Sequence, residues 1–272
     1  MSARAIILGL WLLGLIAALT YAVAAEDPRA ARLSLFLATL GATAVVLLAV
    51  LAVRARLGAG DEARRPWTWI AVGLTARLIA ELRLATLYFH SIPDFISADP
   101  ALHFIYLQAL RYLYVLADLL IAGALLITLR ALASLGLGLY LRRRAWLIIA
   151  ALALLPVVQI VIQDQLWSGD QPADPGILAF RVISVASSAL VGGLSFALAA
   201  LTRQMGGGAL AWVWGLAAAA GLSKALAFLA SAFAKESLYA GLLDQSFLWT
   251  FAAAWLLAAA TYAGLIRPAA PR

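Results

Sequence analysis

Apolar runs long enough to cross a lipid bilayer recur along the whole chain. Windows of about 20 apolar residues, the length that spans a bilayer, lie at approximately 5–25, 29–53, 67–89, 101–130, 145–166, 176–202, 208–232 and 238–266. Because backbone polar groups must find their partners within a membrane-spanning segment, each window should form an α-helix. The pattern predicts an all-α polytopic transmembrane helix bundle with eight spans.

The composition agrees with a membrane protein. Hydrophobic residues make up 65% of the chain and charged residues 12%, with a mean hydropathy of +0.98, whereas about 25% of a soluble domain is charged. No segment of soluble composition is long enough for a second domain. Since the connections are short, helices that are neighbours in sequence are expected to pack as antiparallel pairs.

The first apolar run has two interpretations. Ala22-Val23-Ala24 fits the small-x-small rule of signal peptidase, and cleavage there would leave seven spans. The run from residue 5 to residue 25 is longer than the usual 7–15 residues of a signal core, which favours a retained helix. We divide the chain into residues 1–25, a first transmembrane helix or signal peptide, and residues 26–272, a transmembrane domain of seven helices.

Basic residues predict the orientation of the helices. One set of connecting segments holds Arg4, Arg54, Arg56, Arg64, Arg65, Arg130, Arg142, Arg143, Arg144, Arg203, Arg267 and Arg272. The opposite set holds only Arg29, Arg32 and Lys235. The positive-inside rule places the first set, and with it the carboxyl terminus, in the cytoplasm. We expect a plasma or inner membrane, with the bilayer as partner. Because the net charge of +7 is spread over short loops, nucleic acid is not an expected partner.

Local motifs mark several helix ends. Asp-Pro occurs at Asp27-Pro28, Asp99-Pro100 and Asp174-Pro175, each just before an apolar run. Aspartate caps free N–H groups and proline suits the first helical position, so we expect helix starts there. Gly206-Gly207-Gly208 predicts a tight turn. Aromatic anchors at the membrane interfaces are predicted at Trp67, Trp69, Trp146, Trp167 and Tyr239.

Ionisable residues inside the apolar windows are the strongest functional signal, because a charge within a bilayer is costly. They are Arg77, Glu81, Arg83, Arg111, Asp118, Arg181, Lys224 and Asp244, with Asp164 near a window end. Counted from the outer turns, opposite signs fall at similar depths in three consecutive hairpins. This depth match predicts the ion pairs Glu81–Arg111, Arg77–Asp118, Lys224–Asp244 and Asp164–Arg181.

Two interpretations of these charges stay open. They are either structural ion pairs that set helix register, or the lining of an outward-opening polar cavity that binds a small anionic or zwitterionic ligand. The candidate site consists of Arg77, Glu81, Arg111, Asp118, Lys224 and Asp244.

Other chemistry has little support in the sequence. Cysteine is absent, and the two histidines, His90 and His103, lack further clustered ligands, so we expect no metal and no cofactor. A retinal Schiff base at Lys224 would be expected to have an acidic residue one turn earlier, but that position is Ala220. The sequence therefore argues against retinal. We find no motif that assigns catalytic residues.

Three functions therefore remain. A non-enzymatic receptor-like or small-solute-binding protein comes first, and a transporter is the alternative. The third is an intramembrane enzyme, similar to terpene cyclases, with Glu81 or Asp118 as the acid. A cation at the depth of each carboxyl group works against that role, because it stabilises the carboxylate.

The stretch RPWTWIAVGLTARLIAELRLA, followed by RYLYVLADLLIAGALL, resembles uncharacterised multi-pass integral membrane proteins of fungi. The features they share are a tryptophan-led helix with a mid-span arginine and a following helix with aromatic and acidic residues. The resemblance covers about a fifth of the chain and implies a seven-helix-type membrane fold without assigning any functional residue.

Overall fold

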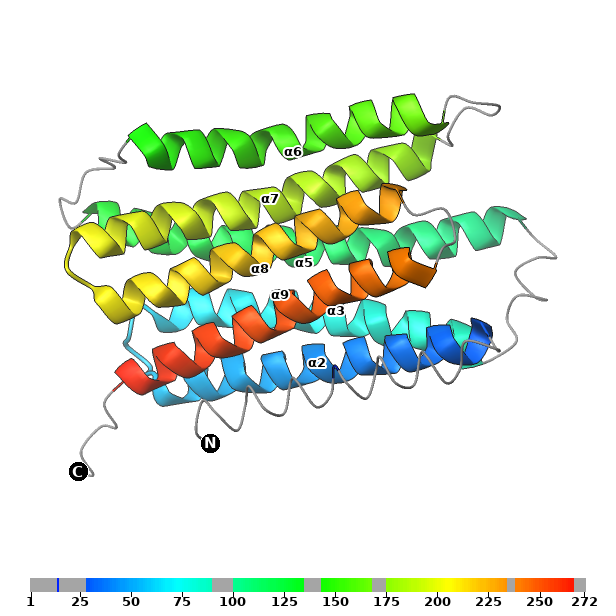
Figure 1. Cartoon of the computed structure of the whole chain (residues 1–272). Coiled ribbons are helices and arrows are strands. Elements are labelled where there is room, and N and C mark those ends of the chain that lie inside the picture. Colours follow the sequence, from blue (N-terminus) through cyan, green and yellow to red (C-terminus); the bar gives the residue numbers. More distant parts are fainter. Residues whose placement is uncertain are drawn as a thin grey trace.

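A computed structural model of the chain describes Gly14 and residues 28–89, 100–134, 143–167, 175–233 and 238–266, with side chains described over most of these ranges. In these ranges the chain forms seven α-helices and no strand (Figure 1). They are α2 (Pro28–Arg56), α3 (Arg64–Phe89), α5 (Pro100–Ser134), α6 (Arg143–Trp167), α7 (Pro175–Gln204), α8 (Gly208–Phe233) and α9 (Leu238–Leu265). The last seven predicted windows match these helices to within four residues at each end. The first window, and the question of its cleavage, lies outside the described residues apart from Gly14.

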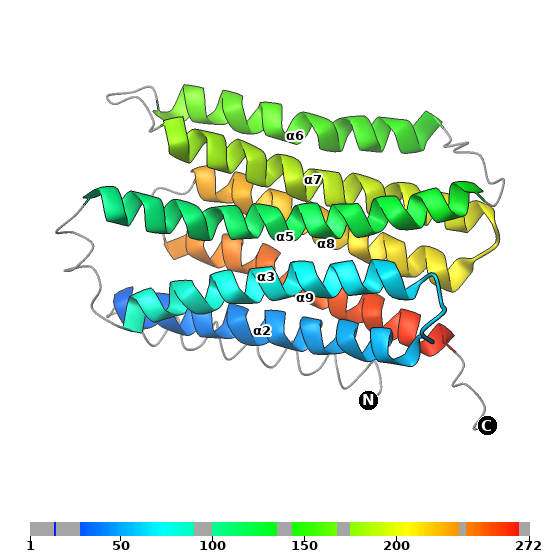
Figure 2. The same cartoon turned by 180° about the vertical axis from the view of Figure 1, so that it is seen from behind.

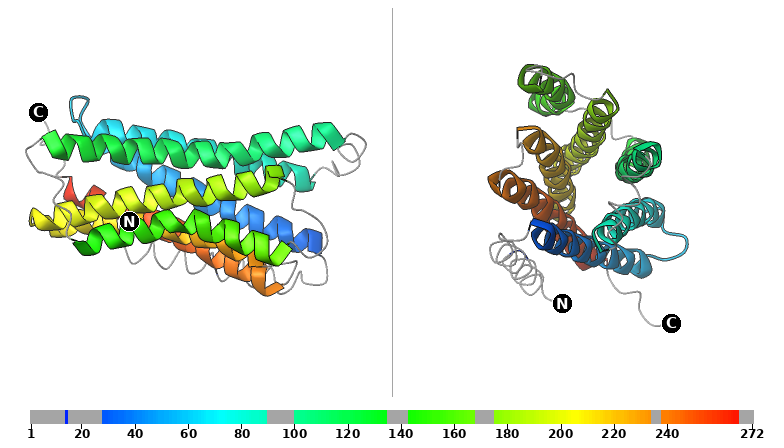
Figure 3. Two further views of the ribbon diagram at one scale, coloured as in Figure 1. Left: turned by 90° about the horizontal axis from the view of Figure 1, so that it is seen from above. Right: turned by 90° about the vertical axis from the view of Figure 1, so that its right-hand side faces the viewer.

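Six of the helices form a closed ring. In the order α2, α3, α5, α7, α8 and α9, each helix packs on the next, and α9 packs back on α2. The remaining helix, α6, packs on α7 and α8 from outside, as the end-on view in Figure 3 shows. Sequence neighbours pack together as predicted except for α5 and α6, since the main packing partners of α5 are α3 and α7. Which helices enclose the interior of the ring therefore does not follow from their order in the sequence.

The helix starts and one turn follow the predicted motifs. Pro28, Pro100 and Pro175 are the first residues of α2, α5 and α7, while the aspartates before them lie outside the described residues. Gly206 adopts a φ of 76°, in the left-handed region that glycine enters without strain. The Gly207 N–H donates to the Thr202 carbonyl at 3.0 Å, which closes the end of α7. The glycine triplet is thus the tight turn that brings α8 antiparallel to α7.

Arginines gather at one end of the bundle, the left end in Figure 1 and the right end in Figure 2. The described arginines at these helix ends are Arg54, Arg56, Arg64, Arg65, Arg130, Arg143 and Arg203. Two of them also tie helices together. Arg54 Nε donates to Thr68 Oγ1 at 2.9 Å, which links α2 to α3, and Arg56 Nη1 donates to the Ala263 carbonyl at 3.0 Å near the end of α9.

Five helices contain segments long and apolar enough to cross a bilayer, over residues 37–56, 112–134, 178–204, 208–229 and 246–265. This fits an integral, multi-pass membrane protein. Large apolar side chains such as Leu48 and Trp212 are exposed on the outside of the bundle, where lipid would contact them.

Trp67 departs from its predicted role as an interfacial anchor. It is buried and contacts the tilted ring of Tyr262 with ring centroids 4.8 Å apart, because α3 and α9 both contribute to the apolar core.

Candidate functional site

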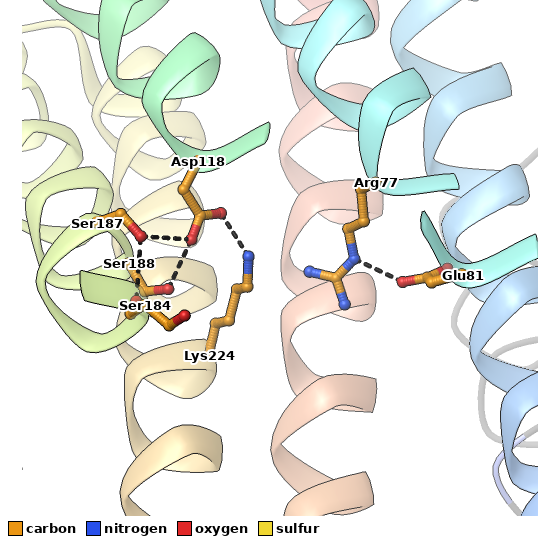
Figure 4. A network of polar contacts seen from close by, with 7 residues as sticks. All are labelled: Arg77, Glu81, Asp118, Ser184, Ser187, Ser188 and Lys224. Carbon is orange, nitrogen blue, oxygen red and sulfur yellow. Dashed lines mark hydrogen bonds and ion pairs between the residues drawn. The ribbon is translucent and has the colours of Figure 1, made fainter. Parts of the chain in front are cut away.

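Four charged side chains lie buried in the middle of the ring. Arg77 and Glu81 come from α3, Asp118 from α5 and Lys224 from α8, and each is at most 3% exposed. Figure 4 shows them as two groups, Asp118 with Lys224 and Arg77 with Glu81. Taking a charge out of water costs several kcal/mol even in a relaxed protein, so each of these groups needs a partner.

Asp118 is the most fully bonded of the four. Its Oδ1 accepts a hydrogen bond from Lys224 Nζ at 2.5 Å. Its Oδ2 accepts from Ser188 Oγ at 2.8 Å and from Ser187 Oγ at 3.2 Å, both on α7. Three donors from two helices therefore stabilise this carboxylate, and the network joins α5, α7 and α8.

The pair of Arg77 and Glu81 has fewer hydrogen bonds than Asp118 has. Arg77 Nε donates to Glu81 Oε1 at 2.7 Å, one turn along the same helix. Arg77 Nη1 and Glu81 Oε2 are buried and have no hydrogen-bond partner in the described structure. Leaving such polar atoms unpaired costs free energy, which an added polar atom would recover. In Figure 4 one of the two Nη nitrogens of Arg77 points away from Glu81, toward the side of Lys224.

These contacts correct the predicted pairing. Asp118 pairs with Lys224, so the predicted Arg77–Asp118 pair is wrong. Arg77 instead pairs with Glu81, because residues four apart face each other on a helix. The side chains of Arg111, Asp244 and Asp164 lie outside the described part. The predicted pairs Glu81–Arg111, Lys224–Asp244 and Asp164–Arg181 therefore stay predictions, although the described partners of Glu81 and Lys224 are Arg77 and Asp118.

An aromatic ring connects the two groups. Phe251 of α9 has its ring centroid 4.2 Å from Arg77 Cζ and 5.8 Å from Lys224 Nζ. Tyr114 of α5 lies 6.0 Å from Arg77 Cζ. Both cations are thus within cation–π distance of Phe251, which offers partial compensation for their lost hydration.

Glycines allow the helices that carry these charges to approach closely. A Cβ on Gly221 of α8 would lie 2.5 Å from the Gly192 nitrogen of α7, and Gly221 is one turn before Lys224. A Cβ on Gly73 of α3 would lie 2.8 Å from the Ala117 carbonyl oxygen of α5, beside Asp118. Because only glycine avoids these clashes, both close contacts help to define the positions of the buried charges.

A small, mostly apolar recess reaches Arg77 of the second pair. It is lined by Thr39 and Thr43 of α2, Arg77 of α3, and Trp249 and Phe251 of α9, together with small or apolar neighbours. Its volume of about 10 Å³ is room for about one water molecule. The recess beside the Arg77 side chain therefore has room for a water-sized group.

The described side chains hold no cluster of three or more metal-ligating residues. In the comparisons with known proteins, neither a family model nor a curated protein nor a solved structure matches the chain. The site must therefore be interpreted from its own geometry.

Several residues of the site were not predicted from the sequence. Ser187 and Ser188 look like ordinary small packing residues in the sequence, yet they bond Asp118. Their spacing from Ser184, three and four residues, was the available signal, since it puts a polar stripe on one face of an apolar helix. Phe251 and Trp249 carried no comparable signal.

Proposed function

We propose that the protein crosses the membrane eight times with both termini in the cytoplasm, and that the ring binds a small anionic or zwitterionic solute at Arg77. The arginines gathered at one end of the bundle support this orientation, because positive residues stay on the cytoplasmic side. Although α3 carries charges, it is packed between α2 and α5 and turns Arg77 and Glu81 inward, which suits a spanning helix.

One observation carries the binding proposal. Arg77 is 3% exposed, its Nη1 has no partner in the described structure, and its side chain lines the recess. A guanidinium group offers five N–H donors in a fixed plane and suits anionic groups. Thr39 and Thr43 also line this recess. The site thus combines a buried positive charge, an unpaired N–H donor and a small space beside it.

Binding fits this geometry better than acid catalysis does. A general acid inside the membrane would need a carboxyl group without a cation in bonding distance. Glu81 is 2.7 Å from Arg77 and Asp118 is 2.5 Å from Lys224. Each carboxyl group therefore has a cation within bonding distance, and we rank a receptor-like or solute-binding role above an intramembrane enzyme.

A transporter is the second candidate. Arg77 and Lys224 both lie within 6 Å of the Phe251 ring centroid, so the two ion pairs are close enough to interact with each other's partners. Rearrangement of such pairs could accompany movement of a solute through the ring. Transport predicts solute flux into sealed vesicles, whereas binding without flux supports the receptor-like function.

The binding proposal can be tested on purified protein in lipid nanodiscs. Thermal unfolding is measured while sodium gluconate is exchanged for sodium chloride at constant ionic strength. Chloride should raise the melting temperature, since a ligand at 100 times its Kd stabilises the folded state by about 2.7 kcal/mol.

Two variants make the experiment specific. Arg77→Gln should abolish the ligand-dependent stabilisation. Arg203→Gln removes the same charge from the exposed, arginine-rich end and should retain it. An equal ligand effect in Arg77→Gln, or no effect of chloride on the wild type, would overturn the proposal.

A further inference from the structure

We propose that an anionic phospholipid binds where α3 and α5 lie side by side on the outside of the ring, with its phosphate held by Arg65 and Arg130 at the arginine-rich end. This surface does not involve the buried charges around Arg77. The inference therefore goes beyond the proposed function and is tested independently of it.

The two arginines lie at similar depths on neighbouring helices. α3 and α5 pack on each other and run antiparallel, as Figure 2 shows. A Cβ on Gly73 would lie 3.4 Å from the Leu120 Cβ, which sets the register of the two helices. Arg65 is eight residues before Gly73 and Arg130 is ten residues after Leu120. At a rise of about 1.5 Å per residue these separations are about 12 and 15 Å, so both arginines lie within one helical turn of the same depth.

Arg65 and Arg130 are exposed and keep their N–H donors unused among the described residues. Other arginines at this end differ, since Arg54 bonds Thr68 and Arg56 bonds the carbonyl of Ala263. A guanidinium group can hold a phosphate through two parallel N–H donors. Two such groups at one depth therefore suit a phosphate ester.

Acidic side chains near Arg65 leave it available. The nearest in sequence are Asp61 and Glu62, in the connection that precedes α3. Asp61 Oδ1 accepts a hydrogen bond from the Ala63 N–H at 2.9 Å, so this carboxylate takes part in the turn. Neither carboxylate is within ion-pair distance of Arg65 in the described structure.

Each arginine stands at the end of an exposed apolar row. Residues three, four or seven apart share one face of a helix, so the exposed positions that follow Arg65 and precede Arg130 continue the same faces. The large apolar members are Trp69, Val72, Ile79 and Leu82 on α3, and Leu126, Leu119, Leu116 and Tyr112 on α5. Thr75 is the polar member of the α3 row, and its hydroxyl donates to the Ala71 carbonyl at 2.8 Å. Both rows therefore suit contact with acyl chains.

A phospholipid fits this arrangement as a whole. Arginines just inside the membrane boundary attract anionic headgroups, and tryptophan is common at headgroup level, where Trp69 lies one turn from Arg65. A second protein helix could cover the apolar rows but would leave the two cations unexplained. A soluble phosphate compound would bind the cations and leave the rows unexplained.

The test measures lipid preference next to Trp69. The full-length protein is placed in phosphatidylcholine nanodiscs with a rising share of phosphatidylglycerol whose brominated acyl chains quench tryptophan fluorescence, and brominated phosphatidylcholine is the reference. The Trp69 signal is the difference between the wild type and Trp69→Phe. Phosphatidylglycerol should quench it at a lower share than phosphatidylcholine does. Arg65→Gln and Arg130→Gln should each reduce the relative affinity for phosphatidylglycerol about fivefold.

Controls separate a built site from general attraction to a negative membrane. Arg203→Gln removes the same charge from an exposed position on α7 at the same end and should keep the preference. Glycerol phosphate at constant ionic strength should not displace the brominated lipid. Equal quenching of the wild type by the two lipids, an equal loss in Arg203→Gln, or displacement by glycerol phosphate would overturn the proposal. The chloride effect of the Arg77 site should be unchanged in Arg65→Gln and Arg130→Gln, so the two proposals fail separately.

Discussion

Lys224 of α8 bonds Asp118 of α5 at 2.5 Å although the two residues are 106 positions apart and the helix between them in the ring is α7. The ammonium group thus reaches past α7 through the interior of the ring, and the serines of α7 bond the same carboxylate. One buried carboxylate therefore joins three helices that the sequence order does not place together.

Removing either partner of this pair should destabilise the fold. Asp118→Asn leaves the Lys224 ammonium buried without its counter-ion and should cost about 3–5 kcal/mol of unfolding free energy. The apolar double variant Asp118→Leu/Lys224→Met should cost less than Asp118→Leu alone or Lys224→Met alone, because no charge stays unpaired. Equilibrium unfolding in detergent gives the free energies of unfolding of these three variants. Additive single effects would contradict a direct interaction between the two side chains.

The serine contacts make a separate prediction. Ser188→Ala should cost about 1–3 kcal/mol, because Asp118 Oδ2 loses its shorter neutral hydrogen bond. Ser195→Ala is the matched control on α7, since the Ser195 hydroxyl is buried without a partner in the described structure and its removal should be neutral or stabilising. Equal losses in both variants would indicate that packing, not the hydrogen bond, matters at these positions.

The close approach of α7 and α8 should be sensitive to one methyl group. Gly221→Ala places a Cβ 2.5 Å from the Gly192 backbone nitrogen and should cost about 1–3 kcal/mol through forced separation of the helices. Gly215→Ala is the control on the same helix, because nothing lies within 4 Å of its Cβ position and alanine is the better helix former. The same unfolding assay compares them, and a neutral Gly221→Ala would contradict the close contact.

The helices were predictable because membrane spans leave a strong signal. Long apolar runs broken by Asp-Pro and Gly-Gly-Gly gave the seven described helices with ends that differ by a few residues at most. Backbone hydrogen bonding inside a membrane leaves few alternatives to such helices. The ring closure of α9 on α2 and the outer position of α6 were not predictable, since every helix of a bundle offers more than one apolar face.

The sequence predicted which charged residues lie together in the site, but it did not predict which of them form ion pairs with each other. Depth along each helix identified Arg77, Glu81, Asp118 and Lys224 as central residues, and all four are buried together. Depth carries no information about rotation around the helix or about which helices meet in the ring. Lys224 therefore bonds Asp118 across the interior, and Arg77 bonds Glu81 on its own helix.

Phe251 offers a test of the aromatic contact between the two groups. Phe251→Leu keeps an apolar side chain but removes the ring that lies 4.2 Å from Arg77 Cζ, so the buried cation loses about 0.5–2 kcal/mol of cation–π stabilisation. We expect lower stability and a weaker chloride effect. Trp212→Leu, at an exposed position on the outside of α8, should change neither quantity. A Phe251→Leu variant with unchanged stability would contradict the contact.

The central claim, that Arg77 binds a compact anion inside the ring, is tested most directly by locating a bromide ion. Crystals of the protein grown with sodium bromide and measured at the bromine absorption edge should show an anomalous peak in the recess beside Arg77 and Thr43. Crystals of Arg77→Gln grown in the same way should lack that peak. Wild-type crystals with well-ordered density for the recess and no bromine signal there would contradict the account.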